Sequence, residues 1–160
     1  MANHWEEAVE QLISVFGGQS QNTLGASVFQ SSSSTTSADL ENFARSCYKH
    51  FAGKSWGAFG EENWSKPWAL LFHRASGTAP NIIQEIDSLS DPATALAGSQ
   101  LTENHDSPAD AAKALQGVFD SADIQDLRIY RAGDSEAITG LLIAATSKSH
   151  QAVVLVFLMD

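Results

Sequence analysis

The sequence predicts an α+β fold: one domain, residues 1–160, with a mainly antiparallel sheet and helices packed on both of its faces. Three observations predict it. Apolar residues recur at helical spacing in several separate segments, the apolar period shortens to two near residue 127, and two almost wholly apolar segments follow. Strands that are apolar on both faces need a covering layer on each, so we expect the C-terminal hairpin at the centre of the sheet.

The first helix is predicted between Trp5 and Phe16, where apolar residues fall on one face. Gly17 and Gly18 are typical of a helix end. A short apolar segment follows at residues 26–29. Residues 30–38 are rich in serine and threonine, which indicates a flexible loop.

The second helix is predicted to begin after Thr36 and Asp39, which have capping-box spacing, and to end at Gly53. Cys47 lies at the centre of its apolar face, so we interpret it as a small hydrophobic residue. His50 follows three residues later, which leaves a cysteine–histidine nucleophile pair as the weaker interpretation.

A loop rich in tryptophan and glycine is predicted at residues 53–67. Exposed aromatic side chains in loops suit recognition, because they offer large rigid contact areas. The alternative is that these rings fold back and seal one end of the core. A phosphate-binding loop is excluded, because Tyr48 stands where its first glycine should be. The predicted binding residues are Trp56, Phe59, Glu61, Glu62 and Trp64.

Residues 68–74 are predicted to form a buried strand that ends at His73 and Arg74. We interpret His73 as a hydrogen-bonded structural residue. A pocket bounded by the tryptophan-rich loop, His73 and Arg74 would instead suit a small enzyme or a ligand-binding domain.

Three more helical segments and three strands complete the prediction. Pro80 is placed in the first turn of one helix, Pro92 opens a short turn or helix to about residue 96, and Ser107 with Pro108 begins the third. Residues 98–106 are predicted to be a loop. The strands are residues 127–131, 137–145 and 152–159, and the polar residues 146–151 join the last two as a hairpin.

Composition narrows the range of functions. The formal net charge is −10, from 9 basic and 19 acidic residues. Nucleic acids and anionic membranes attract clustered cations, so neither is expected as a partner. The five histidines are dispersed and there is one cysteine, so no metal site, cofactor or disulfide is predicted. The N-terminal segment lacks the features of a signal peptide, and we expect a cytoplasmic location.

The C-terminal residues 129–160 resemble the end of the bacterial nuclease A inhibitors. The matching positions are Tyr130, Arg131, Gly133, Asp134 and Glu136. The resemblance covers about a fifth of the chain, and the family's Glu-Thr ending is Met159-Asp160 here. It implies an α-β-α sandwich and an inhibitor role, but it does not extend upstream, and we do not assign the chain to the family.

The sequence therefore favours a non-enzymatic, acidic protein-binding module, such as an inhibitor, immunity, adaptor or regulatory protein. We expect a protein partner with a basic surface, because a negative surface steers such partners. The alternatives are a small enzyme or ligand-binding domain, and a homo-oligomer joined through the tryptophan-rich loop.

Overall fold

The computed structural model describes residues 4–18, 25–31, 33–56, 67–75, 77–134 and 138–159. It confirms the α+β fold. The helices are α1 (His4–Phe16), the 3-10 turn η1 (Ser37–Asp39), α2 (Leu40–Trp56), α4 (Ile82–Asp87), α5 (Pro92–Leu101) and α6 (Pro108–Phe119). The strands are β1 (Gly25–Gln30), β2 (Trp68–His73), β3 (Ile124–Ala132), β4 (Thr139–Ser147) and β5 (Ala152–Met159).

The five strands form one sheet in the order β1-β5-β4-β3-β2, and every neighbouring pair is antiparallel. The C-terminal hairpin is central, as predicted, because β4 holds the middle position and β5 lies beside it. Every residue of β4 is buried. The two edges are β1 and β2.

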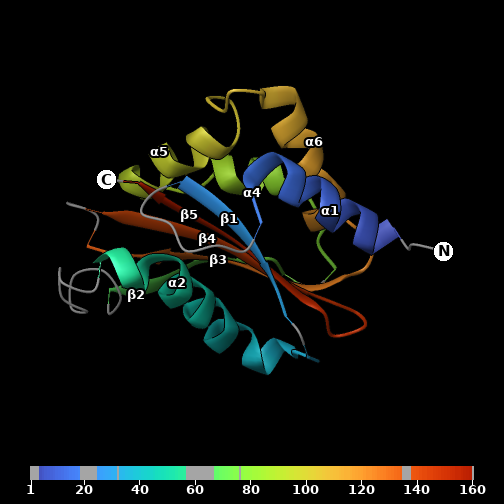
Figure 1. Cartoon of the computed structure of the whole chain (residues 1–160). Coiled ribbons are helices and arrows are strands. Elements are labelled where there is room, and N and C mark those ends of the chain that lie inside the picture. Colours follow the sequence, from blue (N-terminus) through green and yellow to red (C-terminus); the bar gives the residue numbers. More distant parts are fainter. Residues whose placement is uncertain are drawn as a thin grey trace.

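Helices cover both faces, which confirms the predicted layers (Figure 1). Helix α2 lies on one face, while α1, α4, α5 and α6 lie on the other. Because neighbouring strand residues point to opposite faces, Ile143 and Leu155 pack beneath the four helices, and Leu142 and Val154 pack against α2. No helix in the described ranges is long and apolar enough to cross a membrane.

Several helix boundaries differ from the prediction. Helix α2 continues past Gly53 to Trp56. At its start, the Thr36 hydroxyl contacts the Asp39 carboxylate at 3.2 Å and makes no capping bond to a helix amide. Helix α4 is capped by Asn81, whose side chain accepts a hydrogen bond from the backbone N–H of Gln84.

Helix α5 is longer than predicted, because it continues to Leu101 through residues that read as a loop. Gly98 explains the difference. A Cβ built on Gly98 would lie 2.6 Å from Cγ2 of Ile86, so the glycine allows α5 to approach α4 closely. A glycine needed for close packing has the same sequence signature as a glycine in a loop.

The prediction that β2 is buried is wrong. None of its six residues is fully buried, and Leu70 is 51% exposed. An apolar run usually indicates a buried strand. Here β2 is the outermost strand of the sheet and has a neighbouring strand on one side, β3.

Candidate functional site

The predicted binding residues lie outside the part of the chain that the structure describes. This applies to Phe59, Glu61, Glu62 and Trp64, and also to the side chain of Trp56, the last residue of α2. The segment that holds them leads directly into β2. The described elements next to it in the chain are therefore the end of α2 and the start of β2.

Two residues of β2 direct their backbone groups away from the sheet. The carbonyl oxygen of Pro67 accepts a hydrogen bond from the N–H of Gly133 at 3.1 Å, so Pro67 faces β3. Inward and outward backbone groups alternate along an antiparallel strand, so Trp68 and Leu70 face outward. In the described part of the chain, no backbone group pairs with them on that side.

A bulge gives β2 apolar side chains on both faces of the sheet. The pairing with β3 shifts between Leu70 and Phe72. Leu71 and Phe72 consequently both pack toward the four-helix core, while Leu70 lies opposite Tyr130 on the α2 face. The outer edge thus combines unpaired backbone groups with apolar side chains above and below.

On the α2 face, Trp68 is the centre of an aromatic cluster. Its ring centroid lies 5.0 Å from that of Tyr130 and 6.4 Å from that of Tyr48. The guanidinium carbon of Arg45 stands 4.5 Å from the Trp68 ring centroid, in a cation–π contact. The indole N–H of Trp68 has no hydrogen-bond partner within the described residues. Leu70 continues this cluster toward solvent.

On the four-helix face, a small pocket of about 110 Å³ lies beside β2. Its lining residues are Leu71, Phe72, Ser88, Leu89, Ser90 and Asp91. Desolvation raises the pKa of Asp91, but hydrogen bonds from Thr94 and the charge of Arg131 outweigh it, so the pKa lies below its ordinary value. The pocket therefore combines three apolar side chains with two serines and a carboxylate that Arg131 already pairs at 3.1 Å.

A polar network crosses from β2 to β3 on the α2 face. His73 Nε2 lies 2.7 Å from Asp126 Oδ1, and Arg128 donates to the other oxygen of Asp126 at 2.9 Å. Arg128 also donates to the Tyr130 hydroxyl at 3.2 Å. Asp126 is buried, whereas the His73 side chain is half exposed. The contacts agree with the structural interpretation of His73.

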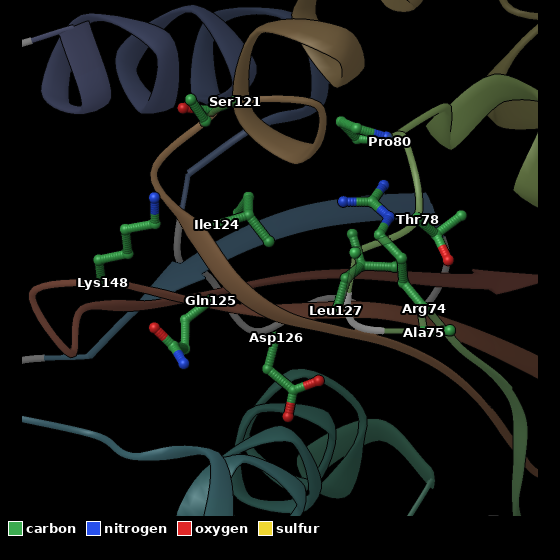
Figure 2. A pocket seen from close by; sticks show the side chains of 12 residues that line it. Arg74, Ala75, Thr78, Pro80, Ser121, Ile124, Gln125, Asp126, Leu127 and Lys148 are labelled. Carbon is green, nitrogen blue, oxygen red and sulfur yellow. The ribbon is translucent and has the colours of Figure 1, made fainter.

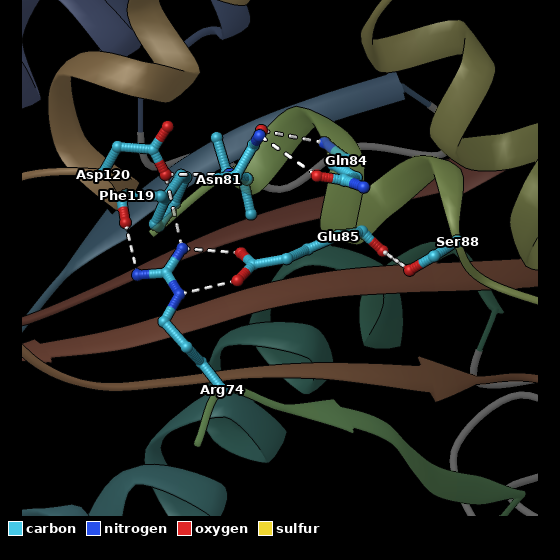
Figure 3. Close-up of polar contacts among 8 residues, drawn as sticks. Arg74, Asn81, Gln84, Glu85, Ser88, Phe119 and Asp120 are labelled. Atoms are coloured by element: carbon cyan, nitrogen blue, oxygen red, sulfur yellow. Dashed lines mark hydrogen bonds and ion pairs between the residues drawn. The ribbon is translucent and has the colours of Figure 1, made fainter. Parts of the chain in front are cut away.

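Arg74 is the centre of a buried ion network at the end of β2 (Figure 3). Its guanidinium binds both carboxylate oxygens of Glu85, at 2.8 and 2.6 Å, and donates to the carbonyl oxygen of Phe119 at 2.7 Å. Asp120 lies 3.4 Å from the same group. Desolvation raises the pKa of Asp120. With two carboxylates around it, Arg74 has a structural role and offers no free charge to a ligand.

A larger pocket of about 320 Å³ lies beyond the end of β2 (Figure 2). Arg74, Thr78 and Pro80 line one side of it, and Ser121 and Lys148 line the other. The sequence predicted, as an alternative, a pocket near His73 and Arg74. Arg74 does line this pocket, but its guanidinium is bound to Glu85. His73 is not among the lining residues.

Neither a cysteine nucleophile at Cys47 nor a metal site is supported by the described residues. Burial raises the pKa of the Cys47 thiol to about 12, which disfavours the thiolate that a nucleophile needs. The His50 ring instead meets the Phe29 ring edge-on, with centroids 5.8 Å apart. Within the described residues, no group of three or more His, Cys, Asp or Glu side chains is placed to hold a metal ion.

Comparison with known proteins gives no family for this chain. No protein-family model matches it, and no curated protein matches it. The likeness to the nuclease A inhibitors is therefore limited to the C-terminal residues.

Sequence reasoning missed Leu70 and the network that joins His73, Asp126 and Arg128. Lys66 and Pro67 directly precede the apolar run from Trp68 to Phe72 and are typical of an edge strand, but a proline also stands at the first residue of other strands, so the signal is weak. The network joins residues 53 positions apart, and only the register of β2 against β3 brings them together.

Proposed function

We propose that this protein is an acidic, non-enzymatic protein-binding module, of the kind found among inhibitors, immunity proteins, adaptors and regulatory proteins. Its contact surface is centred on the outer edge of β2 and on residues 53–67, which precede it. The observation that carries the proposal is Leu70, which is 51% exposed on a strand whose outer backbone groups have no partner among the described residues.

Three properties of the surrounding surface support the proposal. Trp68 is partly exposed and packs on the buried rings of Tyr48 and Tyr130, so its exposed part offers rigid contact area, as residues that dominate binding energy do. Apolar side chains flank the edge on both faces of the sheet. The net charge of −10 favours a partner with a basic surface and speeds the encounter with it.

The test compares two exposed leucines. Leu70 and Leu96 are similarly exposed, at 51% and 53%, but Leu96 lies on α5 and does not line the pocket beside β2. The immobilised protein is incubated with lysate of its source organism, and retained proteins are identified by mass spectrometry. We expect a basic protein that is retained by the wild type and by Leu96→Lys and lost with Leu70→Lys.

A double variant, Trp56→Ala with Trp64→Ala, tests the preceding segment in the same assay. Loss of the same partner would show that the segment and β2 act together. If every retained protein survives both Leu70→Lys and the tryptophan variant, the proposed surface is wrong. Circular dichroism and thermal unfolding of each variant show whether a lost partner reflects a changed fold.

A second candidate function is the binding of a small anion in the larger pocket. The observation that favours it is Lys148, which lines the pocket and makes no ion pair with any described residue. Phosphate ions would raise the melting temperature of the wild type and of Lys113→Ala, which changes an exposed lysine on α6. An equal rise in Lys148→Ala would exclude the pocket as the site.

A further inference from the structure

We propose that the partner supplies an extended segment that adds to β2 as a sixth strand of the sheet. This inference rests on the proposed function and names the form of the contact. Strand addition takes its affinity from backbone hydrogen bonds and its specificity from the side chains on alternate positions.

The backbone of β2 is prepared for such pairing. Trp68 and Leu70 each direct one N–H and one C=O outward, with no partner in the described ranges. The opposite edge differs, because the N–H of Val28 in β1 donates to the carbonyl oxygen of Gly17 at 2.9 Å. Among the described residues, the segment after α1 thus occupies part of the β1 edge, whereas no hydrogen bond occupies the outward groups of Trp68 and Leu70.

The side chains beside β2 indicate what the added strand carries. Successive residues of a strand point to opposite faces of the sheet. On the four-helix face they would meet Leu71 and Phe72 and the 110 Å³ pocket beside them, whose volume suits a single side chain. On the α2 face they would meet Leu70 and Trp68. The added segment therefore has apolar residues directed to both faces.

Charge selects a basic segment over a second copy of this chain. The whole chain carries −10, so a lysine or arginine in the added strand would be favoured. Two copies would repel each other.

The experiment uses random linear peptides displayed on phage and selected on the full-length protein, with no assumption about the natural partner. We expect the enriched peptides to combine neighbouring apolar residues with lysine or arginine. Synthetic copies should bind Leu96→Lys as tightly as the wild type and Leu70→Lys at least about tenfold more weakly.

Hydrogen exchange then locates the contact. Bound peptide should slow exchange at the Trp68 and Leu70 amides by about tenfold or more and leave Val28 in β1 unchanged. The inference is overturned if no peptide is enriched, if Leu70→Lys binds equally well, or if Trp68 and Leu70 stay unprotected. It is also overturned if the protein alone dimerises at high concentration and protects these two amides.

The two proposals fail in different ways. If the lysate partner is lost with Leu70→Lys but leaves the Trp68 and Leu70 amides unprotected, the protein-binding function stands and strand addition does not. If no lysate partner depends on Leu70 or on the tryptophan segment, the proposed function falls, and the strand addition built on it falls too.

Discussion

The two edges of the sheet, β1 and β2, have six residues each and are both largely apolar, yet they end the sheet differently. In β1, Val28 and Phe29 are buried, and the chain segment after α1 closes the edge, with Gly17 accepting the N–H of Val28. In β2, no residue is fully buried, and Trp68 and Leu70 direct backbone groups outward.

The difference is that the edge at β1 is covered by the protein's own chain, whereas the edge at β2 can accept another strand. An open, apolar edge invites aggregation, and natural sheets usually protect it. The segment after α1 protects the edge of β1. Within the described residues, the outer edge of β2 has no such partner. The contact surface that we propose at β2 would account for the asymmetry.

The largest expected effect follows from removing residues 153–160. Strand β1 pairs only with β5, so the deletion takes away the sole strand that connects β1 to the sheet and also uncovers β4. We expect the truncated chain to be insoluble, because it exposes the apolar residues of two strands. Fractionation after expression and circular dichroism check the result.

Leu70→Lys is the matched comparison at the other edge. It changes an exposed residue, so we expect a soluble protein that unfolds cooperatively near the wild-type temperature. Soluble, cooperatively melting material from the truncated chain would refute the central role assigned to β5.

The sequence predicted the centre of the fold better than its periphery. The almost continuous apolar runs of β4 and β5 require covering on both faces, and this requirement alone places the hairpin inside the sheet. The position of β2 could not be predicted in the same way. Its apolar run also suits a central strand, and the strand order that makes it an edge depends on long-range pairing.

The sequence predicted the region of the candidate site but not its contacts. It pointed to residues 53–67 and to His73 and Arg74, and of these the structure describes the surroundings of His73 and Arg74. There, Arg74 is paired with Glu85 and His73 with Asp126. Neither partner carries a sequence signal, because both are ordinary acidic residues that the tertiary structure brings into contact.

The next largest effect is expected at the point where β2 is fixed to the helices. Arg74→Ala removes the cation from a network in which both ion-pair partners, Arg74 and Glu85, have side chains less than a tenth exposed. It leaves the Glu85 carboxylate buried and unpaired, so we expect a loss of about 3–5 kcal/mol in the free energy of unfolding. Urea denaturation measures it.

Glu41→Gln is the control for Arg74→Ala. Its carboxylate faces Arg45 at 3.9 Å, and both side chains are about two fifths exposed. A solvated pair of this kind contributes less than about 1 kcal/mol, so the variant should unfold almost like the wild type. Equal effects of the two variants would show that the Arg74 network does not hold β2 in place.

The smallest effect is expected at the closed edge. Gly17 has φ +98°, a backbone conformation that side chains disfavour, and its carbonyl oxygen accepts the N–H of Val28. We expect Gly17→Ala to destabilise the protein by about 1–2 kcal/mol and to speed hydrogen exchange at the Val28 amide. Exchange at the Leu70 amide should not change, because β2 does not depend on this contact.

Gly117→Ala shows whether the effect comes from conformation. Gly117 is exposed on α6, and a Cβ there would meet only Ala8 Cβ at 3.8 Å, an ordinary contact. The same substitution should therefore stabilise the protein by about 0.5–1 kcal/mol, since alanine favours helices. A Gly17→Ala variant as stable as the wild type, with Val28 still protected, would mean that β1 is closed by its pairing with β5 alone. The asymmetry between the edges would then lie in burial and not in the Gly17 contact.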